Sequence, residues 1–411
     1  MRTLDVGAIK QDFPILSREI NGKRLVYLDS ASSSQKPQAV LDAMDDMYRT
    51  HYANIHRGVY AIAEQATAAY EGGRRKVARF VNAHAPEEIV FTRNATESIN
   101  LVAYSWARAN LREGDAIVLS HMEHHANVVP WHILAAERGV QLRWIPLTPE
   151  YLLDTSNVEE LLEGAKLLAI SAMSNVLGTI NDIASLSRAA RAAGAHVLVD
   201  ACQYVPHVAT DVREWDADFV AFSAHKLLGP TGIGALWARR ELLEEMPPFL
   251  GGGEMIRDVR LDGFTPNDVP WKFEAGTMPI VEAVGFGAAI DYLTSLGMDA
   301  VRAHEMQLTE YAIAALQDRF GESLRIYGPL DVTQRGGALS FLFEGIHAHD
   351  ISQVLDEDAV CVRAGHHCAK PLMRRLGVPA TSRASFYVYN DEADVDALVE
   401  ALAKAQKFFE I

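Results

Sequence analysis

The chain has 411 residues, of which 49% are hydrophobic and 22% charged, a balance typical of a globular protein whose length favours two domains. Its net charge of -16 disfavours nucleic acid or an anionic membrane surface as the main partner. No apolar run approaches a bilayer-spanning length, the first ten residues carry charges of both signs, and the three cysteines show no CxxC spacing. We therefore expect no membrane association and a cytosolic location.

Residues 23–294 repeat one arrangement, in which a short apolar strand ends at a polar residue and a helical stretch follows. The predicted strands include residues 88–92, 115–120, 166–171, 195–199 and 217–222. This alternation predicts an α/β fold with a mostly parallel sheet and helices on both faces. Ligands of such sheets bind beyond the carboxyl ends of the strands. The polar residues at those ends should therefore converge on one site.

The composition changes near Gly297, and residues 295–411 are predicted to form a smaller C-terminal domain. The predicted elements are a long helix over 298–320, strands at 324–327, 337–343, 360–364 and 385–389, a helix from Asp350, and a closing helix opened by Asp391 or Glu392. Short strands crossed by helices predict an α+β domain with an antiparallel sheet. We expect the N-terminal segment 1–22 to pack on this domain.

Lys226 directly follows the apolar strand 217–222, where an ammonium group is costly to bury. Such a lysine either points to water or holds a carbonyl cofactor as a Schiff base. Gly229, Gly232 and Gly234 follow it and permit a tight turn with close backbone approach. This stretch is the first candidate for a cofactor site.

Asp200 stands at the end of the strand 195–199, where a carboxylate is poorly solvated and needs a cationic partner. It either caps the following helix or pairs with a protonated pyridine nitrogen. That proton is what makes pyridoxal phosphate an electron sink. The proximity of Lys226, one strand away, favours the cofactor.

A phosphate group requires several N–H donors, and the predicted helix start at residues 94–98 provides them. Thr96 offers both its N–H and its hydroxyl group. Ser223 and His225 add donors from the lysine loop. The alternative for this stretch is an ordinary helix N-cap.

His124 follows the strand 115–120, and its flat imidazole is suited to cover the face of an aromatic cofactor. The neighbouring His125, together with His366, His367 and Cys368, also suggests a metal site. Adjacent histidines do not usually turn inward together, so we expect no metal.

Cys368 precedes a short helix predicted from Pro371 to Gly377, and a helix N-terminus stabilises a thiolate nucleophile. Cys202 and Cys361 lie in apolar sequence and are expected to be small buried core residues. Arg383 lies between a predicted turn and the last predicted strand. Its planar fork suits an amino-acid carboxylate, and the alternative is a surface salt bridge.

Nine motifs spread through nearly the whole chain lie at residues 27–31, 54–58, 123–127, 174–178, 200–203, 223–226, 251–255, 273–277 and 363–369. Together they resemble the SufS-type cysteine desulfurases, which are pyridoxal-phosphate enzymes of the aminotransferase class V group. The resemblance implies a homodimer with the aspartate aminotransferase fold (fold type I). It places a seven-stranded sheet in a large cofactor-binding domain over residues 23–294.

Carried over residue by residue, the resemblance implies that Lys226 binds the cofactor covalently and Asp200 pairs with its pyridine nitrogen. The implied further cofactor contacts are His124 stacking on the ring, Gln203 at the phenolic oxygen, Thr96, Ser223 and His225 at the phosphate, and Thr277 reaching the phosphate from the second subunit. Asn175 and Arg383 would bind the substrate, Arg383 by its carboxylate. Cys368 would be the nucleophile.

The implied reaction converts L-cysteine to L-alanine and leaves the sulfur on Cys368 as a persulfide, and the same machinery can cleave L-selenocysteine. Lys226 would move the α-proton. Only 14 residues, including two prolines, separate Cys368 from Arg383, so the loop cannot swing far. We infer that a SufE-like or SufU-like acceptor protein comes to the persulfide and feeds iron-sulfur cluster assembly.

Two other functions compete with this interpretation. A plain aminotransferase would use Lys226, Asp200 and Arg383 but not Cys368, and a catalytically silent scaffold would use none of them. Two positions also depart from the family pattern, because Lys370 stands where glutamine is usual and Met278 where proline is usual. Neither removes a catalytic group, and we expect the Lys370 cation to favour the Cys368 thiolate.

Overall fold

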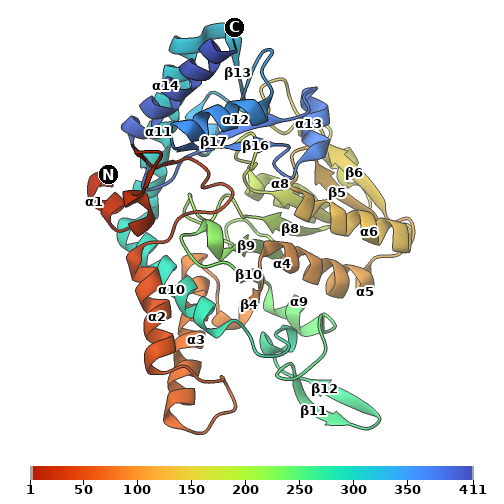
Figure 1. Ribbon diagram of the computed structural model, residues 1–411. Helices are drawn as coiled ribbons and strands as arrows, with labels where there is room; N and C mark the ends of the chain where they lie inside the picture. Colours follow the sequence, from red (N-terminus) through yellow and green to blue (C-terminus); the bar gives the residue numbers. More distant parts are fainter. Residues whose placement is uncertain (1–2, 410–411) are drawn as a thin grey trace.

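The computed structural model describes residues 3–409, and its largest layer is a seven-stranded sheet in the order β4-β10-β9-β8-β7-β5-β6 (Figure 1). The strands are β4 (Ile89–Thr92), β5 (Ala116–Ser120), β6 (Gln141–Ile145), β7 (Ala165–Ser171), β8 (His196–Asp200), β9 (Phe219–Ser223) and β10 (Gly234–Ala238). β10 runs antiparallel to both neighbours, and the pairs from β9 to β6 are parallel. The predicted mostly parallel sheet is confirmed.

The strands β6 and β10 carry weaker sequence signals than the five predicted strands. β6 is an edge strand that is only partly buried and contains Arg143, so it lacks the continuous apolar pattern of a central strand. β10 begins at Gly234, inside the glycine-rich stretch after Lys226. Glycine is typical of turns, so the start of this strand is not apparent from the sequence.

Each face of the sheet is covered by its own helices, because successive side chains of a strand point to opposite faces. In β5, Val118 packs in a core shared with α2, α3, α7, α8 and α10, whereas Ile117 and Leu119 pack in a core shared with α4, α6 and α9. The first set is α2 (Gln38–Thr50), α3 (Ala61–Phe80), α7 (Val158–Leu162), α8 (Ile183–Ala192) and α10 (Ile280–Leu296). The second set is α4 (Ala95–Leu101), which continues through a π-helical turn into α5 (Arg108–Asn110), with α6 (Val129–Arg138) and α9 (Arg240–Glu245).

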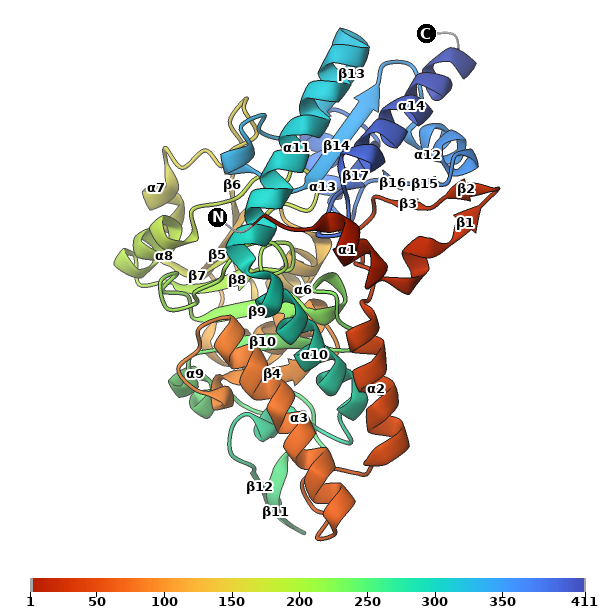
Figure 2. The same ribbon diagram turned by 90° about the vertical axis from the view of Figure 1, so that its left-hand side faces the viewer.

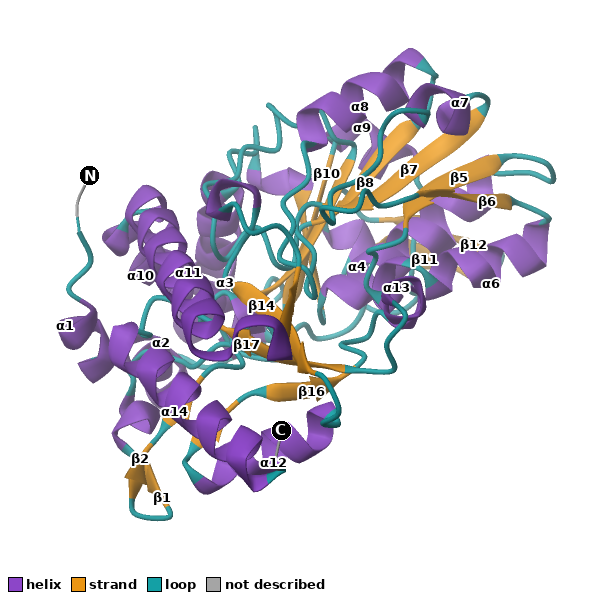
Figure 3. Ribbon diagram, turned by 90° about the horizontal axis from the view of Figure 1, so that it is seen from above, coloured by secondary structure: helices purple, strands orange, loops and turns teal. Residues whose placement is uncertain are grey.

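A four-stranded antiparallel sheet has the order β13-β14-β17-β16. It lies above the large sheet in the view of Figure 1, and Figure 3 shows both sheets from above. Its strands are β13 (Leu324–Tyr327), β14 (Ala338–Phe343), β16 (Arg363–Gly365) and β17 (Thr381–Ser385). The helices that pack on it are α11 (Met298–Phe320), α12 (Ala348–Glu357) and α14 (Glu392–Phe408) (Figure 2). The N-cap predicted at Asp391 is present as a capping box with Asp394.

The predicted strand at 385–389 is wrong, because the last strand of this sheet is β17, at residues 381–385. The apolar residues that follow it are buried for a different reason. Tyr387 and Tyr389 pack in the core of the large sheet, and the Tyr387 hydroxyl donates to the Pro206 carbonyl over 2.9 Å. Arg383 consequently lies inside a strand, opposite Ser340 of β14.

The predicted strand at 360–364 is divided between two sheets. β15 (Val360–Cys361) pairs in parallel with β3 (Val26–Tyr27), while β16 joins the four-stranded sheet. The chain therefore changes sheets directly before the Cys368 segment.

The N-terminal segment contacts the C-terminal part of the chain. It contains α1 (Val6–Gln11) and the hairpin of β1 (Glu19–Ile20) and β2 (Lys23–Arg24). Lys10 forms an ion pair with Asp391 at 2.6 Å, and Phe13 stacks edge-on against Tyr389. The domain limits 23–294 and 295–411, with 1–22 on the smaller domain, stay a prediction, and residues 1, 2, 410 and 411 lie outside the described residues.

A hairpin of β11 (Ile256–Arg260) and β12 (Gly263–Pro266) projects from the body of the protein. Among residues 3–409, no single helix is long and apolar enough to cross a membrane. The consecutive helices α10 and α11 meet these criteria only when taken together, and they are bent by 74° at their junction.

Candidate active site

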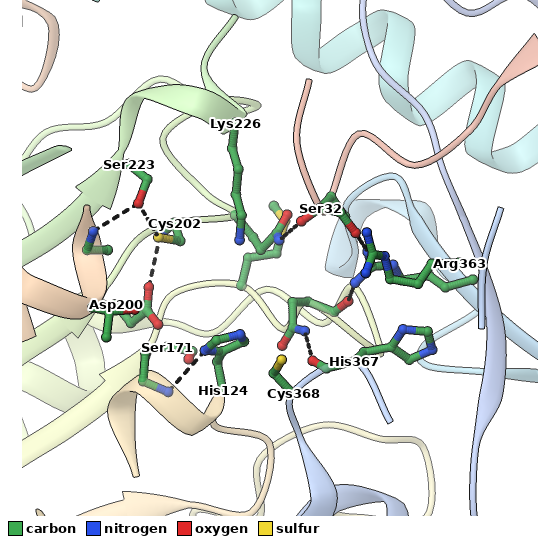
Figure 4. A pocket seen from close by; sticks show the side chains of 18 of the residues that line it. Ser32, His124, Ser171, Asp200, Cys202, Ser223, Lys226, Arg363, His367 and Cys368 are labelled. Carbon is green, nitrogen blue, oxygen red and sulfur yellow. Dashed lines mark hydrogen bonds between the residues drawn. The ribbon is translucent and has the colours of Figure 1, made fainter. Parts of the chain in front are cut away.

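A cavity of about 510 Å³ lies between the carboxyl ends of the parallel strands and the β16–β17 segment (Figure 4). Of the predicted site residues, all except Thr277 line it: Lys226, Cys368, His124, Asp200, Gln203, Thr96, Ser223, His225, Asn175 and Arg383. The expected convergence of polar strand-end residues is therefore present.

Lys226 ends a short 3-10 turn, Ala224–Lys226, which directly follows β9, and its side chain extends into the cavity (Figure 4). The glycines after it are needed for this geometry. Gly232 has a φ of +80°, and a Cβ on Gly234 would lie 2.7 Å from the Asn94 Cα. The lysine loop can thus approach the start of α4 only with glycine at position 234.

Asp200 is the last residue of β8, next to the lysine strand β9, and is 6% exposed. Burial raises the pKa of its carboxyl group, although the Cys202 N–H, which donates to Oδ1 over 3.0 Å, and the nearby Lys226 act in the opposite direction. Asp200 is therefore suited to share a proton with a basic partner in the cavity.

The turn after β8 carries two further cavity residues. Gln203 donates from Nε2 to the Ala31 carbonyl over 2.7 Å. Cys202 was expected in the core, but it is only partly buried and lines the cavity. The prediction was wrong because it placed Cys202 in a strand. The strand β8 ends at Asp200, so Cys202 lies in the turn that follows. Burial, with Asp200 close by, raises the Cys202 pKa to about 12, which keeps this thiol protonated.

The start of α4 supplies amide and hydroxyl groups beside the lysine loop. Asn94 is the N-cap, and the Ala95 N–H donates to the Ser223 Oγ over 2.9 Å. Thr96 lies exposed in the first turn. Burial and the cations Lys226 and Lys36 lower the pKa of His225 to about 4, so this side chain is neutral at physiological pH.

His124 accepts a hydrogen bond at Nδ1 from the Ala126 N–H over 3.0 Å. A neutral ring that accepts at Nδ1 carries its proton at Nε2. Burial, together with Lys226, His125 and Arg383, lowers the His124 pKa to about 3. The cavity therefore contains a neutral imidazole with a fixed tautomer.

Arg383 is 2% exposed and is held by neighbours from distant parts of the chain. Its Nη1 donates to the Asn175 carbonyl over 2.8 Å and its Nη2 to the Ser32 Oγ over 2.7 Å, while Asp29 lies 3.3 Å from Nη2. Its Nε is buried and has no hydrogen-bond partner within residues 3–409. A cavity-lining guanidinium with a free N–H group is suited to bind a carboxylate.

Cys368 is exposed and lies two residues before α13 (Lys370–Leu376). The predicted short helix is confirmed, with its start one residue earlier and Gly377 at its C-cap. The φ angles of His367 and Cys368 are +48° and +54°, a left-handed conformation that non-glycine residues rarely adopt. Cys368 approaches the cavity opposite Lys226 (Figure 4).

Thr277 does not line this cavity. It lines a second cavity, together with Thr92, Phe249 and Pro279. Its role at the cofactor of a second subunit stays a prediction.

The family of the chain is shown by its match to known proteins. Residues 26–398 match the aminotransferase class-V family. The chain belongs to this family. The chain is 52% identical to the probable cysteine desulfurase of Streptomyces coelicolor, over 99% of this chain and 98% of that protein. It is therefore a pyridoxal-phosphate-dependent enzyme of the cysteine desulfurase family.

Solved structures agree with this assignment and confirm the fold. The cysteine desulfurase of Thermococcus onnurineus NA1 superposes with a TM-score of 0.94 at 38% identity and covers 99% of both chains. The cysteine desulfurase CsdA of Escherichia coli, in its S-sulfonic acid form, superposes with a TM-score of 0.91 at 40% identity, over 99% of this chain and 100% of that one.

The cavity fits pyridoxal phosphate. It contains a lysine at a strand end, a buried carboxyl group with a raised pKa and a neutral histidine. The donors at the start of α4 lie beside them. An aldehyde, a pyridine nitrogen, an aromatic face and a phosphate find complementary groups in this set.

Several residues that shape the cavity could not be assigned a role from the sequence. Asp29 forms ion pairs with both Arg383 and Arg363, the latter at 3.0 Å, and Ser32 holds the Arg383 fork. Asp29 belongs to the motif at 27–31. Its partners are more than 330 residues away in the sequence, so no local pattern could indicate the contact.

Proposed function

We propose that this enzyme converts L-cysteine to L-alanine and transfers the sulfur to Cys368. The observation that carries the proposal is the placement of Lys226 and Cys368 on opposite sides of one cavity whose wall also contains Arg383 (Figure 4). An amino-acid substrate bound there by its carboxylate places its side chain within reach of a nucleophilic thiol.

The proposed binding roles are those that the family resemblance implies, and the residues that carry them line the cavity. Lys226 attaches the cofactor, Asp200 holds the pyridine proton, His124 covers the ring and Gln203 contacts the phenolic oxygen. The phosphate is held by Thr96, Ser223 and His225. Arg383 binds the substrate carboxylate through its free Nε, and Asn175, whose carbonyl fixes the Arg383 Nη1, lies beside it. Bound pyridoxal phosphate withdraws electrons from the substrate Cα.

In the proposed reaction Lys226 would hold the cofactor until the substrate binds, and its amine would then take the proton from the substrate Cα. The Cys368 thiolate attacks the substrate sulfur. An S–S bond forms, the Cβ–S bond breaks, and the electron pair of the broken bond stays on the carbon side. Protonation of that carbon, and return of the proton from the Lys226 amine to Cα, give alanine. The balance is L-cysteine plus the Cys368 thiol giving L-alanine plus the Cys368 persulfide.

Replacing Cys368 by serine tests this proposal. We expect Cys368→Ser to retain the cofactor absorbance but to lose alanine and sulfide formation from L-cysteine. Cys361→Ser is the matched control, because Cys361 is a free thiol outside the cavity, and it should retain activity. Unchanged alanine formation by Cys368→Ser would contradict the proposal, and amino transfer to a keto acid would identify an aminotransferase instead.

We further infer that a separate acceptor protein of the SufE-like or SufU-like kind removes the persulfide sulfur for iron-sulfur cluster assembly. This inference is supported by the anchored Cys368 segment, which is bonded to the His125 backbone. Adding the purified acceptor should raise the rate of alanine formation several-fold at saturating L-cysteine. An unchanged rate with every such acceptor of the same organism would contradict it.

L-selenocysteine is a second proposed substrate, because its carboxylate, amine and Cβ–Se bond fit the same groups. Measuring kcat/KM for both amino acids with the purified enzyme decides between them. Alanine formation from L-selenocysteine is expected, and its absence would limit the enzyme to sulfur.

A homodimer and a cytosolic location complete the proposal. The dimer would bring Thr277 to the phosphate of the partner subunit's cofactor. We expect light scattering to give twice the chain mass, and Thr277→Ala to weaken cofactor binding without changing that mass. A monomer that binds the cofactor normally would contradict this role.

A further inference from the structure

We propose that His125, His366 and Cys368 form a binding site for a thiophilic divalent metal ion such as Zn²⁺ at the mouth of the cavity. The site lies outside the residues assigned to cofactor and substrate, except that it shares the Cys368 thiol. Metal binding does not depend on the proposed function. Its consequence, reversible blocking of the nucleophile, does rest on that function.

The three side chains converge from two separate segments. His125 opens a 3-10 turn after β5, and the other two residues follow β16. One possible ligand atom from each residue lies within 4.8 Å of the other two. A tetrahedral zinc ion with bonds of about 2.0–2.3 Å needs ligand atoms about 3.3–3.8 Å apart, so rotation of partly exposed side chains closes the site.

Adjacent histidines rarely bind one metal ion, because their side chains do not usually turn inward together. The proposed site does not require this. One member of each pair faces elsewhere: the His124 ring lines the cavity, and His367 is buried with its Nε2 2.9 Å from the Thr381 hydroxyl. The remaining members, His125 and His366, have ring centroids 5.6 Å apart. The site thus takes one histidine from each pair.

Backbone hydrogen bonds hold the segments in this arrangement. The His125 N–H donates to the Cys368 carbonyl over 2.7 Å, and the Lys370 N–H donates to the His125 Nε2 over 3.0 Å. The Cys368 N–H donates to the His366 Nδ1 over 3.1 Å. Because each ring accepts an amide proton at one nitrogen, metal binding breaks that bond, either directly at that nitrogen or because the ring proton moves onto it. This cost makes the site weaker than a closed structural zinc site.

The ligand set has the chemistry of a zinc site with an open position. Two imidazoles and a thiolate match the ligand types of zinc sites. The fourth position is left for water or for the thiol of a bound amino acid.

Metal binding requires no electron transfer. The Cys368 S–H bond breaks, its proton goes to solvent, and an S–metal bond forms. The sulfur lone pair that would attack the substrate is then occupied. A zinc-loaded enzyme therefore keeps its cofactor and cannot accept sulfur.

Calorimetric titration of the holoenzyme with Zn²⁺, without substrate, tests the site. We expect one ion per chain with release of protons, and about tenfold or greater weakening in His366→Ala and His125→Gln. Zn²⁺ should also slow the alkylation of Cys368 by iodoacetamide, measured by mass spectrometry of the modified peptide. His349→Ala is the matched control, since His349 lines the same cavity outside the cluster.

Several outcomes would overturn the assignment. These are the absence of Zn²⁺ binding, unchanged affinity in both histidine variants that retain cofactor absorbance and native circular dichroism, or equal weakening in His349→Ala. Unchanged Cys368 alkylation in the presence of bound Zn²⁺ would do the same. Zinc binding by a protein that forms no alanine would leave the metal site standing and refute the proposed function alone.

Discussion

The carbonyl oxygen of Cys368 accepts a hydrogen bond from the backbone N–H of His125 over 2.7 Å. This bond ties the segment of the proposed nucleophile to the loop that carries His124. Residues 367 and 368 adopt left-handed φ angles, which cost energy and persist only where the surroundings fix them. The thiol is therefore presented from an anchored turn rather than from a mobile loop.

The cation at position 370 should increase the reactivity of this thiol. Replacing it in Lys370→Gln is expected to slow the alkylation of Cys368 by iodoacetamide about twofold at low ionic strength, and less in high salt, because exposed charges are screened. Arg374→Gln is the control, since Arg374 is an exposed cation at the other end of α13. Identical rates in wild type and Lys370→Gln would refute the effect.

The planar fork of Arg383 should be required for substrate binding. Arg383→Lys keeps the charge but cannot reproduce the bonds to Ser32 and Asn175 while binding a carboxylate. We expect kcat/KM for L-cysteine to fall by about 100-fold, chiefly through KM, with the cofactor spectrum unchanged. This corresponds to the roughly 3 kcal/mol of a charged hydrogen bond.

Arg363→Lys is the matched control for this change, because Arg363 binds the same Asp29 but is largely exposed. We expect a change of less than about threefold there. Equal losses in the two variants would show that the pairing with Asp29, and not the carboxylate contact, controls activity.

Glu123 should make stability depend on pH. It is buried, directly precedes His124 in the chain, and accepts hydrogen bonds from Ser120, Asn127 and Ser171. Burial outweighs these bonds and raises its pKa from 4.5 to about 7. Because the folded protein binds this proton more tightly than the unfolded chain, the free energy of unfolding falls as the pH rises from about 4.5 to 7.

Glu123→Gln removes this titration. We expect the difference in unfolding free energy between wild type and variant to change by on the order of 3 kcal/mol between pH 4.5 and pH 7.5, with the wild type losing stability as the pH rises. Urea unfolding at several pH values measures it. A difference that stays constant with pH would mean that the buried carboxyl group does not titrate in this range.

The close approach of β10 to the start of α4 should depend on Gly234. A methyl group there would meet the Asn94 Cα at 2.7 Å and the Phe222 carbonyl at 2.8 Å, and backbone atoms cannot move aside easily. We expect Gly234→Ala to lower the free energy of unfolding by about 1–3 kcal/mol and to weaken cofactor binding.

Gly232→Ala separates crowding from backbone strain, because no atom lies within 4 Å of a Cβ at position 232 although its φ is +80°. Its cost should be about 1 kcal/mol, with cofactor affinity retained. If Gly232→Ala weakened cofactor binding as much as Gly234→Ala, close packing at Gly234 would not be what shapes the site.

Much of the large sheet and several residues of the site could be predicted from local sequence patterns. Lys226, Asp200 and His124 each follow a short apolar strand, and parallel strands bring their carboxyl ends to one edge. The position of the last strand, β17, could not be predicted from local patterns. The apolar residues Phe386 to Tyr389 resemble a strand locally, but Phe386 is buried in the core of the small sheet and Tyr387 to Tyr389 in the core of the large sheet. Pairing with β14 places the strand at Thr381–Ser385.

The sequence by itself determined the strand and helix alternation, the family and the residue types of the cavity, because these depend on local periodicity and on motifs of a few residues. Only the tertiary structure decided which groups meet: Asp29 with Arg383 across 354 positions, and His125 with Lys370 across 245. Contacts of that separation are set by how the two sheets pack, and no local pattern of side chains encodes them.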